Sequence, residues 1–249
     1  MSFIQKSTLR LIATSAVLLG YLSVQTVTNA SISIMPLGDS ITYGAGSTDN
    51  GYRKPLYQKL TDAGYDFDFV GSQTTGDFGD PQHEGHPGWH ADDAGTDDIL
   101  GQVYNWLVTN PADIILLHIG TNDITAGGQN ANEVGSILDE IDRFSTDTKV
   151  ILALIIDRQT HSPATAQFNI DVNYMAQSRI DAGDDIFVVN MESALNYTTD
   201  MTDNLHPNDA GYAKMADVWY DALVTTTVPE PTTICLLGLG ALGLLRRKK

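Results

Sequence analysis

The chain has almost no cysteine and little positive charge. Its single cysteine, Cys235, stands near the C-terminus, so the residues before it can form no disulfide with one another and use no thiol chemistry. Residues 31–227 hold 30 acidic residues but only 8 basic ones, a net charge near −22. Long-range repulsion from so negative a surface disfavours nucleic acid, anionic lipid and polyanionic glycans as partners.

Long apolar runs are also scarce, and the two clearest stand at the ends of the chain. The first follows Lys6 and Arg10 and ends ahead of the small residues at 28–30, which is the pattern of a secretory signal peptide. A buried N-terminal helix is the alternative, but nothing caps it. We therefore expect residues 1–30 to be a signal peptide and the mature protein to begin near Ser31.

The second apolar run, residues 234–245, lies between a Pro-Glu-Pro motif at 229–231 and four basic residues at 246–249. It is shorter than the roughly 20 residues that span a bilayer comfortably. This tail resembles the PEP-CTERM sorting signal of Gram-negative bacteria, which an exosortase processes. We expect residues 228–249 to be such a tail, and a permanent membrane anchor is the competing interpretation.

Residues 31–227 are enough for one domain with one large core. Continuous apolar runs predict buried strands at 33–37, 67–71, 113–119, 150–156 and 186–190. Helices are expected at 52–63 and 92–108, behind Asn130, behind Ser162 with Pro163 at its first position, and at 208–224. This alternation predicts an α/β fold, a three-layer α/β/α sandwich with a five-stranded parallel sheet.

Polar residues follow the first of these strands abruptly. The apolar residues 34–37 run straight into Gly38-Asp39-Ser40, so Ser40 is expected at the C-terminal end of a buried strand. Open α/β sheets place their chemistry at that edge. A serine is a weak nucleophile unless a base, an orienting acid and oxyanion donors are brought to it.

Two other segments can supply these groups. Asp203 stands three residues before His206, close enough for its carboxylate to orient the imidazole from within one turn, although such a pair alone is more often a surface turn. Asn122 follows another buried strand and offers a side-chain N–H to an oxyanion. His118, within that strand, is expected to be a core residue, and Asp123 to fix the loop.

A long loop, residues 72–91, carries further candidates. Gly88 can bring a backbone N–H close to a ligand, so it is a possible second oxyanion donor. Three histidines and Glu84 leave open a transition-metal site, although their spacing matches no common ligand pattern. Asp77, Asp80 and Glu84 leave open a structural calcium site.

Gly38-Asp39-Ser40, Gly88, Asn122 and Asp203 with His206 occur in the order of the four blocks of the SGNH (GDSL) hydrolase superfamily, which the chain resembles over nearly the whole domain. More narrowly, the chain resembles the third carbohydrate esterase family, which contains acetylxylan esterases, in its segments at residues 69–72, 84–89 and 117–123. The resemblance implies a flavodoxin-like fold and a carboxylic ester hydrolase that needs no cofactor. Because Thr42 occupies the last position of a would-be Gly-x-Ser-x-Gly elbow, the α/β-hydrolase fold is disfavoured.

The resemblance also implies roles for single residues. Ser40 is the nucleophile, His206 and Asp203 complete the triad, and Ser40, Gly88 and Asn122 form the oxyanion hole. Gly71, Gly76 and Gly85 are alternatives to Gly88. Substrate binding is assigned to Trp89 and Asp39.

We therefore expect a secreted, monomeric esterase that removes acetyl groups from a polysaccharide and binds no nucleic acid. The alternatives are a lipid or lysophospholipid esterase on the same triad, and a non-catalytic matrix or carbohydrate-binding protein.

Overall fold

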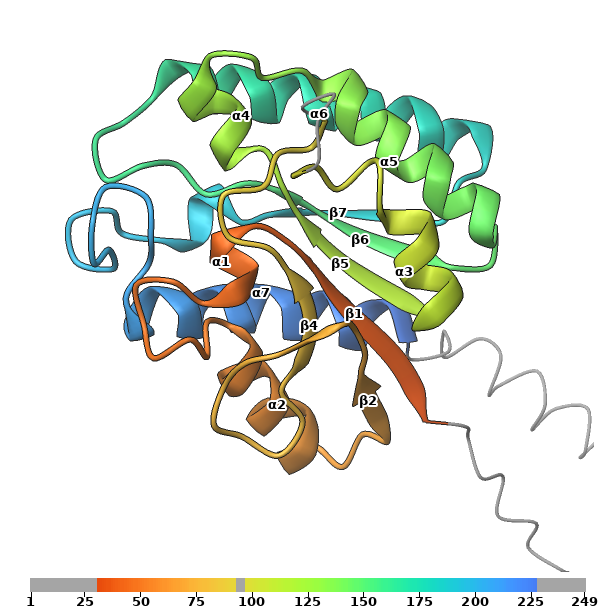
Figure 1. Cartoon of the computed structure of the whole chain (residues 1–249). Coiled ribbons are helices and arrows are strands. Elements are labelled where there is room, and N and C mark those ends of the chain that lie inside the picture. Colours follow the sequence, from red (N-terminus) through yellow and green to blue (C-terminus); the bar gives the residue numbers. More distant parts are fainter. Residues whose placement is uncertain (1–30, 93–96, 228–249) are drawn as a thin grey trace, which may run out of the picture.

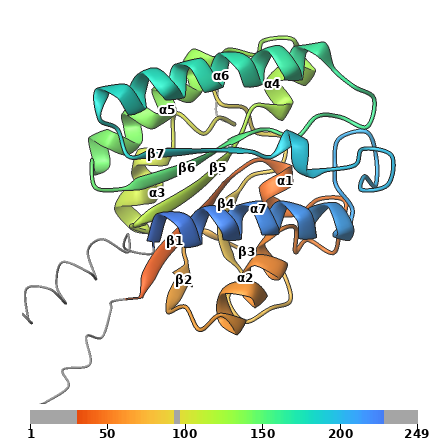
Figure 2. The same cartoon turned by 180° about the vertical axis from the view of Figure 1, so that it is seen from behind.

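A central sheet with helices on both faces organises the molecule (Figures 1 and 2). The computed structural model describes residues 31–92 and 97–227, so the expected signal peptide (1–30) and sorting tail (228–249) lie outside it. Helices α2 (Arg53–Asp62) and α7 (Asp209–Thr227) cover one face of the sheet, and α3 (Val103–Thr109), α5 (Ala131–Phe144) and α6 (Pro163–Ala182) cover the other (Figure 1). Within the described residues, no helix is both long enough and apolar enough to cross a membrane.

The sheet contains all five predicted strands and two more. Its order is β3-β4-β1-β5-β6-β7, with β2 also paired to β1. The strands are β1 (Ile32–Gly38), β2 (Phe67–Phe69), β3 (Gln73–Thr74), β4 (Gln82–Gly85), β5 (Ile114–His118), β6 (Lys149–Leu154) and β7 (Ile186–Asn190). All pairings are parallel except that of β3 with β4. The predicted α/β sandwich is confirmed, but the number of strands and the all-parallel sheet were wrong.

The additional strands arise because β2 is too short to cover the edge of β1. It pairs with residues 32–34 of β1, which leaves Leu37 and Gly38 to pair with Glu84 and Gly85 of β4. The sequence of β4, Gln-His-Glu-Gly, has no apolar residue and therefore gives no strand signal. The segment expected to be a loop is thus partly sheet.

All five predicted helices are present, as α2 (Arg53–Asp62), α3 (Val103–Thr109), α5 (Ala131–Phe144), α6 (Pro163–Ala182) and α7 (Asp209–Thr227). The described residues also form α1 (Ser40–Tyr43), α4 (Thr121–Ala126) and a 3-10 turn, η1 (Glu192–Ala194), which were not predicted. Asn130 and Ser162 cap α5 and α6 as predicted. The helix expected at 92–108 begins only at Val103, because the Asp98 carboxylate accepts the Gly101 N–H and holds a turn there (2.6 Å).

Alternate residues of β1 point into two hydrophobic cores. Ile34 lies in the core beneath α2 and α7, while Met35 and Leu37 lie in the core beneath α3, α5 and α6. The predicted apolar face of the last helix, which includes Trp219, is fully buried in the first core. The two cores fix β1, and hence its C-terminal end, from both sides.

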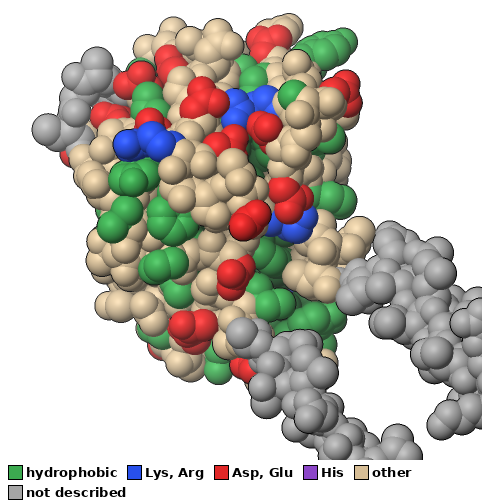
Figure 3. Space-filling model, turned by 90° about the vertical axis from the view of Figure 1, so that its right-hand side faces the viewer, with side chains coloured by type: hydrophobic (Ala, Val, Ile, Leu, Met, Phe, Trp, Pro, Cys, Tyr) green, Lys and Arg blue, Asp and Glu red, His purple; other side chains and the backbone are tan. Residues whose placement is uncertain are grey.

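The few basic side chains are largely paired with acidic ones. On the face shown in Figure 3, blue side chains lie beside red ones. Arg179, for example, forms ion pairs with Asp139, Asp142 and Asp184. Most of the excess negative charge therefore remains uncompensated at the surface.

Candidate active site

Ser40 stands where β1 gives way to a short helix. Asp39 caps this helix, α1, by accepting the Ile41 N–H (2.9 Å), and Ser40 is its first residue. Gly38 allows the turn because a Cβ there would lie 2.1 Å from the His118 carbonyl oxygen of β5. Close contact between the two strand ends thus requires glycine before the serine.

The structure brings together the three residues predicted to form a triad. Ser40 Oγ lies 3.0 Å from His206 Nε2, and His206 Nδ1 lies 2.9 Å from Asp203 Oδ2. Asp203 Oδ1 also accepts the N–H groups of Leu205 (2.7 Å) and His206 (2.8 Å). Partial burial raises the pKa of Asp203, but the hydrogen bonds from His206 and these two N–H groups outweigh it and hold that pKa below its usual value. Asp203 therefore orients the His206 imidazole, whose other nitrogen lies within hydrogen-bond distance of the Ser40 hydroxyl.

The turn that carries His206 rests on the segment that follows α1. A Cβ on Gly46 would lie 2.7 Å from the His206 Cβ, so the two backbones are in close contact. Thr202 Oγ1 donates to the Gly46 carbonyl (2.7 Å), and Tyr212 of α7 donates to the Ala45 carbonyl (2.6 Å). The serine and histidine segments therefore support each other directly.

Asn122 and Gly88, the predicted oxyanion donors, lie on neighbouring segments. The Asn122 amide donates one N–H to the Trp89 carbonyl (2.8 Å), which leaves a second N–H on the same nitrogen. Gly88 has φ +85° and lies in a turn closed by a hydrogen bond from the Trp89 N–H to the His86 carbonyl (3.2 Å). The space where a Gly88 Cβ would stand is open, whereas Gly71, Gly76 and Gly85 are each packed against other residues.

Trp89 is part of an aromatic stack. The His86 ring stacks on both Trp89 and Trp106, with ring centroids 4.3 and 4.6 Å apart, and the two tryptophan rings also contact each other at 5.5 Å. The His86 Nε2 is 2.6 Å from the fully buried carboxylate of Glu84, which also accepts the N–H and hydroxyl of Ser72 (2.7 and 2.6 Å). This network fixes one face of Trp89 and the turn that contains Gly88.

Asp39 was predicted to bind substrate, but it does not lie at the surface of the site. Its side chain is fully buried beneath Ser40, so the expectation that it contacts substrate was wrong. Burial raises the pKa of Asp39 to about 7; the hydrogen bond from the Ile41 N–H opposes this rise only in part, and nearby Asp123 adds a smaller increase. Its second carboxylate oxygen has no hydrogen-bond partner within the described residues. Asp39 therefore supports Ser40 from the protein interior.

His118 is a core residue, as predicted, because it is fully buried and its Nε2 accepts the Ile156 N–H (3.3 Å). Burial lowers the pKa of His118 to about 4, so this imidazole is neutral near pH 7. Each of the residues suggested for metal binding has a protein partner, and Glu84 pairs with His86. Asp77 pairs with Lys54 and Asp80 accepts the Phe69 N–H. Among the described residues, no group of three or more His, Cys, Asp or Glu side chains is arranged to hold a metal ion.

Arg53, for which no role was predicted, is fully buried at the start of α2. Its guanidinium donates five hydrogen bonds of 2.7–3.0 Å, all to main-chain carbonyls, at Thr42, Tyr43, Asp49, Thr75 and Pro81. The one signal in the sequence is a cation at a helix N-terminus, where the helix dipole disfavours it. Arg53 holds the end of α1, and so the nucleophile, against the loop that leads to Gly88.

Comparisons with known proteins agree with this geometry. The model of the GDSL-like lipase/acylhydrolase family matches residues 37–214, and the PEP-CTERM protein-sorting motif matches residues 227–249. A Clostridium thermocellum family 3 carbohydrate esterase is 33% identical with a TM-score of 0.72, over 79% of this chain and 97% of that one. A family 3 carbohydrate esterase from Talaromyces cellulolyticus is 28% identical with a TM-score of 0.68, over 78% and 97%.

A curated relative is longer than this chain. The multidomain esterase of Ruminococcus flavefaciens is 29% identical over 222 residues, which are 78% of this chain but only 28% of that protein. The similarity therefore concerns one part of the relative.

Proposed function

The chain belongs to the GDSL-like lipase/acylhydrolase family, and we propose that it is a serine esterase that removes short acyl groups, above all acetyl, from a polysaccharide. The hydrogen-bonded series Ser40, His206 and Asp203 is the observation that carries this proposal. A serine beside an oriented imidazole is the arrangement that attacks an ester carbonyl. The similarity to a multidomain esterase and to family 3 carbohydrate esterases supports an ester on a carbohydrate.

In the proposed reaction, Ser40 Oγ attacks the ester carbonyl while His206 Nε2 takes its proton. His206 then gives this proton to the departing sugar hydroxyl, and an acyl-enzyme remains on Ser40. Water, deprotonated by His206, attacks the acyl-enzyme and releases acetate. Asp203 keeps the imidazole in the tautomer that presents Nε2 to the serine. No step requires a cofactor.

The oxyanion of each tetrahedral intermediate is held by three N–H groups. These are the main-chain N–H of Ser40, the main-chain N–H of Gly88 and the free N–H of the Asn122 amide. The open space around Gly88 and the anchoring of Asn122 on Trp89 support this assignment. Donors fixed before the reaction stabilise the developing charge without reorganisation.

The negative surface favours a neutral polymer as substrate. A net charge near −22 over residues 31–227 repels polyanions, so acetylated xylan-type chains fit better than acetylated alginate or pectin. Trp89, at the oxyanion turn, is the aromatic side chain best placed to contact a sugar ring. We propose a monomer whose partners are this polymer and an exosortase-type processing enzyme.

The sorting motif supports export to the envelope or exterior of a Gram-negative cell. Mass spectrometry of protein exported by the native host should show a start near Ser31 and loss of the segment after the Pro-Glu-Pro motif. An intact C-terminal tail in the envelope fraction would favour a permanent anchor.

A substrate series tests the activity. Purified 31–227 should hydrolyse 4-nitrophenyl acetate with higher kcat/KM than the butyrate or octanoate, and should release acetate from acetylated xylan. Ser40→Ala, with an unchanged circular dichroism spectrum, is the control. Preference for octanoate would favour a lipid esterase, and Ser40-independent or absent hydrolysis of every ester would favour a non-catalytic binding protein.

A further inference from the structure

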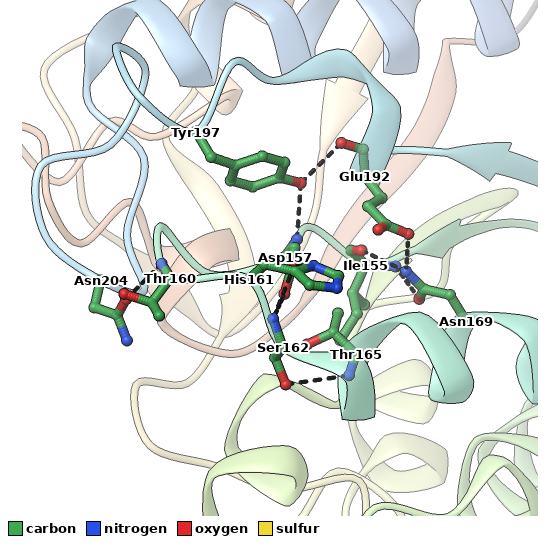
Figure 4. A network of polar contacts seen from close by, with 10 residues as sticks. All are labelled: Ile155, Asp157, Thr160, His161, Ser162, Thr165, Asn169, Glu192, Tyr197 and Asn204. Carbon is green, nitrogen blue, oxygen red and sulfur yellow. Dashed lines mark hydrogen bonds and ion pairs between the residues drawn. The ribbon is translucent and has the colours of Figure 1, made fainter.

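The loop between β6 and α6 contacts the turn that carries the acid and the base. Gln159 N–H donates to the Asn204 main-chain carbonyl (3.0 Å), and Thr160 N–H donates to the Asn204 side-chain carbonyl (2.9 Å). Asn204 follows Asp203 directly, so both bonds restrain the turn that carries the triad residues. Figure 4 shows the contact between Thr160 and Asn204. Asn204 itself makes no hydrogen bond to Ser40, Asp203 or His206 among those found in the described residues.

The same loop also contacts the helix that carries Asn122. Arg158 Nη2 donates to the Thr121 carbonyl (3.1 Å) and to Thr125 Oγ1 (2.8 Å). Thr121 and Thr125 are residues of α4 on either side of Asn122 in sequence. Three consecutive residues, 158–160, thus bind the oxyanion helix on one side and the acid–base turn on the other.

This loop is itself held in place by a buried carboxylate. Asp157 is 4% exposed, and its oxygens accept from His161 Nδ1 (2.6 Å) and the Ser162 N–H (3.1 Å). Its own N–H donates to the Tyr197 hydroxyl (2.8 Å), which donates in turn to the Glu192 carbonyl (2.8 Å). Figure 4 shows His161, the Ser162 N–H and the Tyr197 hydroxyl around Asp157.

The start of the loop is fixed in the same way. The buried Asn169 of α6 accepts the Ile155 N–H and donates to the Ile155 carbonyl, both at 2.8 Å, and its amide also donates to Glu192 (2.9 Å). Residues 155–162 are therefore hydrogen-bonded to α6 and to the segment after β7, in addition to their contacts near the site (Figure 4). A loop with this many internal restraints can restrain other segments.

We propose that residues 158–160 form a brace that sets the position of the acid–base turn relative to the oxyanion helix, with Arg158 and Asn204 as positioning residues. The inference rests on the proposed function. The braced elements need support, because α4 has six residues and the 203–206 turn belongs to no helix or strand. Catalytic groups must be held to within about 0.5 Å of their working positions.

Arg158→Met tests the contact with α4, because methionine keeps much of the length but donates no hydrogen bond. With 4-nitrophenyl acetate, we expect kcat to fall about 10-fold, equivalent to about 1.4 kcal/mol in the barrier, with KM within about twofold. In an Asn122→Ala background the same substitution should cost less than about twofold, since the donor that it positions is gone. Equal losses in both backgrounds would overturn the role.

Arg143→Met is the matched control, since Arg143 pairs with Glu140 on the exposed face of α5. It should leave kcat unchanged, and a loss equal to that of Arg158→Met would overturn the proposal. All rates should be expressed per folded molecule, with the folded fraction measured by urea unfolding.

Asn204 is tested by removal and by a conservative rescue. Asn204→Ala should lower kcat about 10-fold with little change in KM, because the side-chain acceptor of Thr160 is lost. Asn204→Asp keeps that acceptor and should recover kcat to within about threefold of the native value. An unchanged kcat in Asn204→Ala, or equal losses in both variants, would contradict the brace.

Amide hydrogen exchange makes the test independent of activity. Asn204→Ala should speed exchange in residues 203–206, and Arg158→Met should speed it in 121–126, relative to Arg143→Met. Unchanged exchange in both segments would refute the brace even in a protein that hydrolyses no ester. Absence of Ser40-dependent hydrolysis in the unaltered chain would instead refute the proposed function and leave the exchange result to decide the brace.

Discussion

The two sides of β1 are stabilised in different ways. On one side, β5 pairs with five consecutive residues of β1, and β6 and β7 continue the sheet with apolar strands. On the other side, two short strands, β2 and β4, share the edge of β1. The first side is held mainly by aliphatic contacts in a core spread over many residues. The second depends on a few buried polar side chains that each satisfy several groups.

Arg53 is the clearest example of the second kind. It binds five main-chain carbonyls and no carboxylate, and burial lowers the pKa of its guanidinium to about 10. Glu84 likewise holds Ser72 and His86. Stability is therefore distributed on the β5 side and concentrated on the β4 side. The site takes Ser40, Gly88 and Trp89 from the concentrated side and Asn122, Asp203 and His206 from the distributed one.

The largest expected effect comes from removing Ser40 or His206, the two reacting residues of the triad, which the site takes from different sides of β1. Ser40→Ala and His206→Ala should each lower kcat on 4-nitrophenyl acetate on the order of 10⁴-fold or more, because neither group acts without the other. The double variant should be no slower than either single variant. Unfolding by urea should show all three to be folded. Full activity in Ser40→Ala, or losses that multiply in the double variant, would show that the two residues do not act as one unit.

Asp39, where the two sides meet, should make stability depend on pH. Its pKa is raised in the folded state, so its stabilising contribution is complete below about pH 4 and is lost as the pH rises through about 7. A shift of this size corresponds to about 4 kcal/mol at most. The free energy of unfolding of the unaltered protein, minus that of Asp39→Asn, should fall by up to this amount between pH 4 and 8. Parallel pH profiles would show that Asp39 does not titrate in this range.

Conservative substitutions on each side should expose the difference in how they are held. Arg53→Lys keeps the charge but offers three donors to five carbonyls, so it should lower the free energy of unfolding by about 3 kcal/mol. Ile115→Val, in the core on the other side, should cost only about 1 kcal/mol. Urea denaturation at pH 6 measures both. Equal costs would mean that polar contacts on the β4 side are no more concentrated than apolar contacts on the other.

The same difference explains what the sequence could predict. The strands on the β5 side follow from continuous apolar runs. The three-residue spacing of Asp203 and His206 made them candidates, and the resemblance to the SGNH hydrolases gave them their roles. The partners of Arg53 lie 4 to 28 residues away along the chain, and main-chain carbonyls leave no mark in a sequence. Strand β4 has no apolar pattern, and the contacts of Asn204 depend on where a distant loop lies. Local periodicity therefore predicted the scaffold and the family resemblance predicted the triad, but neither predicted the supports around them.

The smallest expected effect concerns Trp89 and is the one that tests the substrate. His86 stacks on the Trp89 ring, and Trp106 contacts both His86 and Trp89. If Trp89 also contacts a sugar ring, Trp89→Ala should lower kcat/KM on acetylated xylan about 3- to 10-fold, the value of one aromatic contact, and on 4-nitrophenyl acetate less than about twofold. Trp106→Ala disturbs the same aromatic cluster without removing Trp89, so it separates loss of the cluster from loss of a substrate contact. It should affect both substrates equally. Equal losses on both substrates in Trp89→Ala would show that Trp89 does not contact the carbohydrate. Together with a preference for longer acyl chains, this result would favour a lipid ester as substrate.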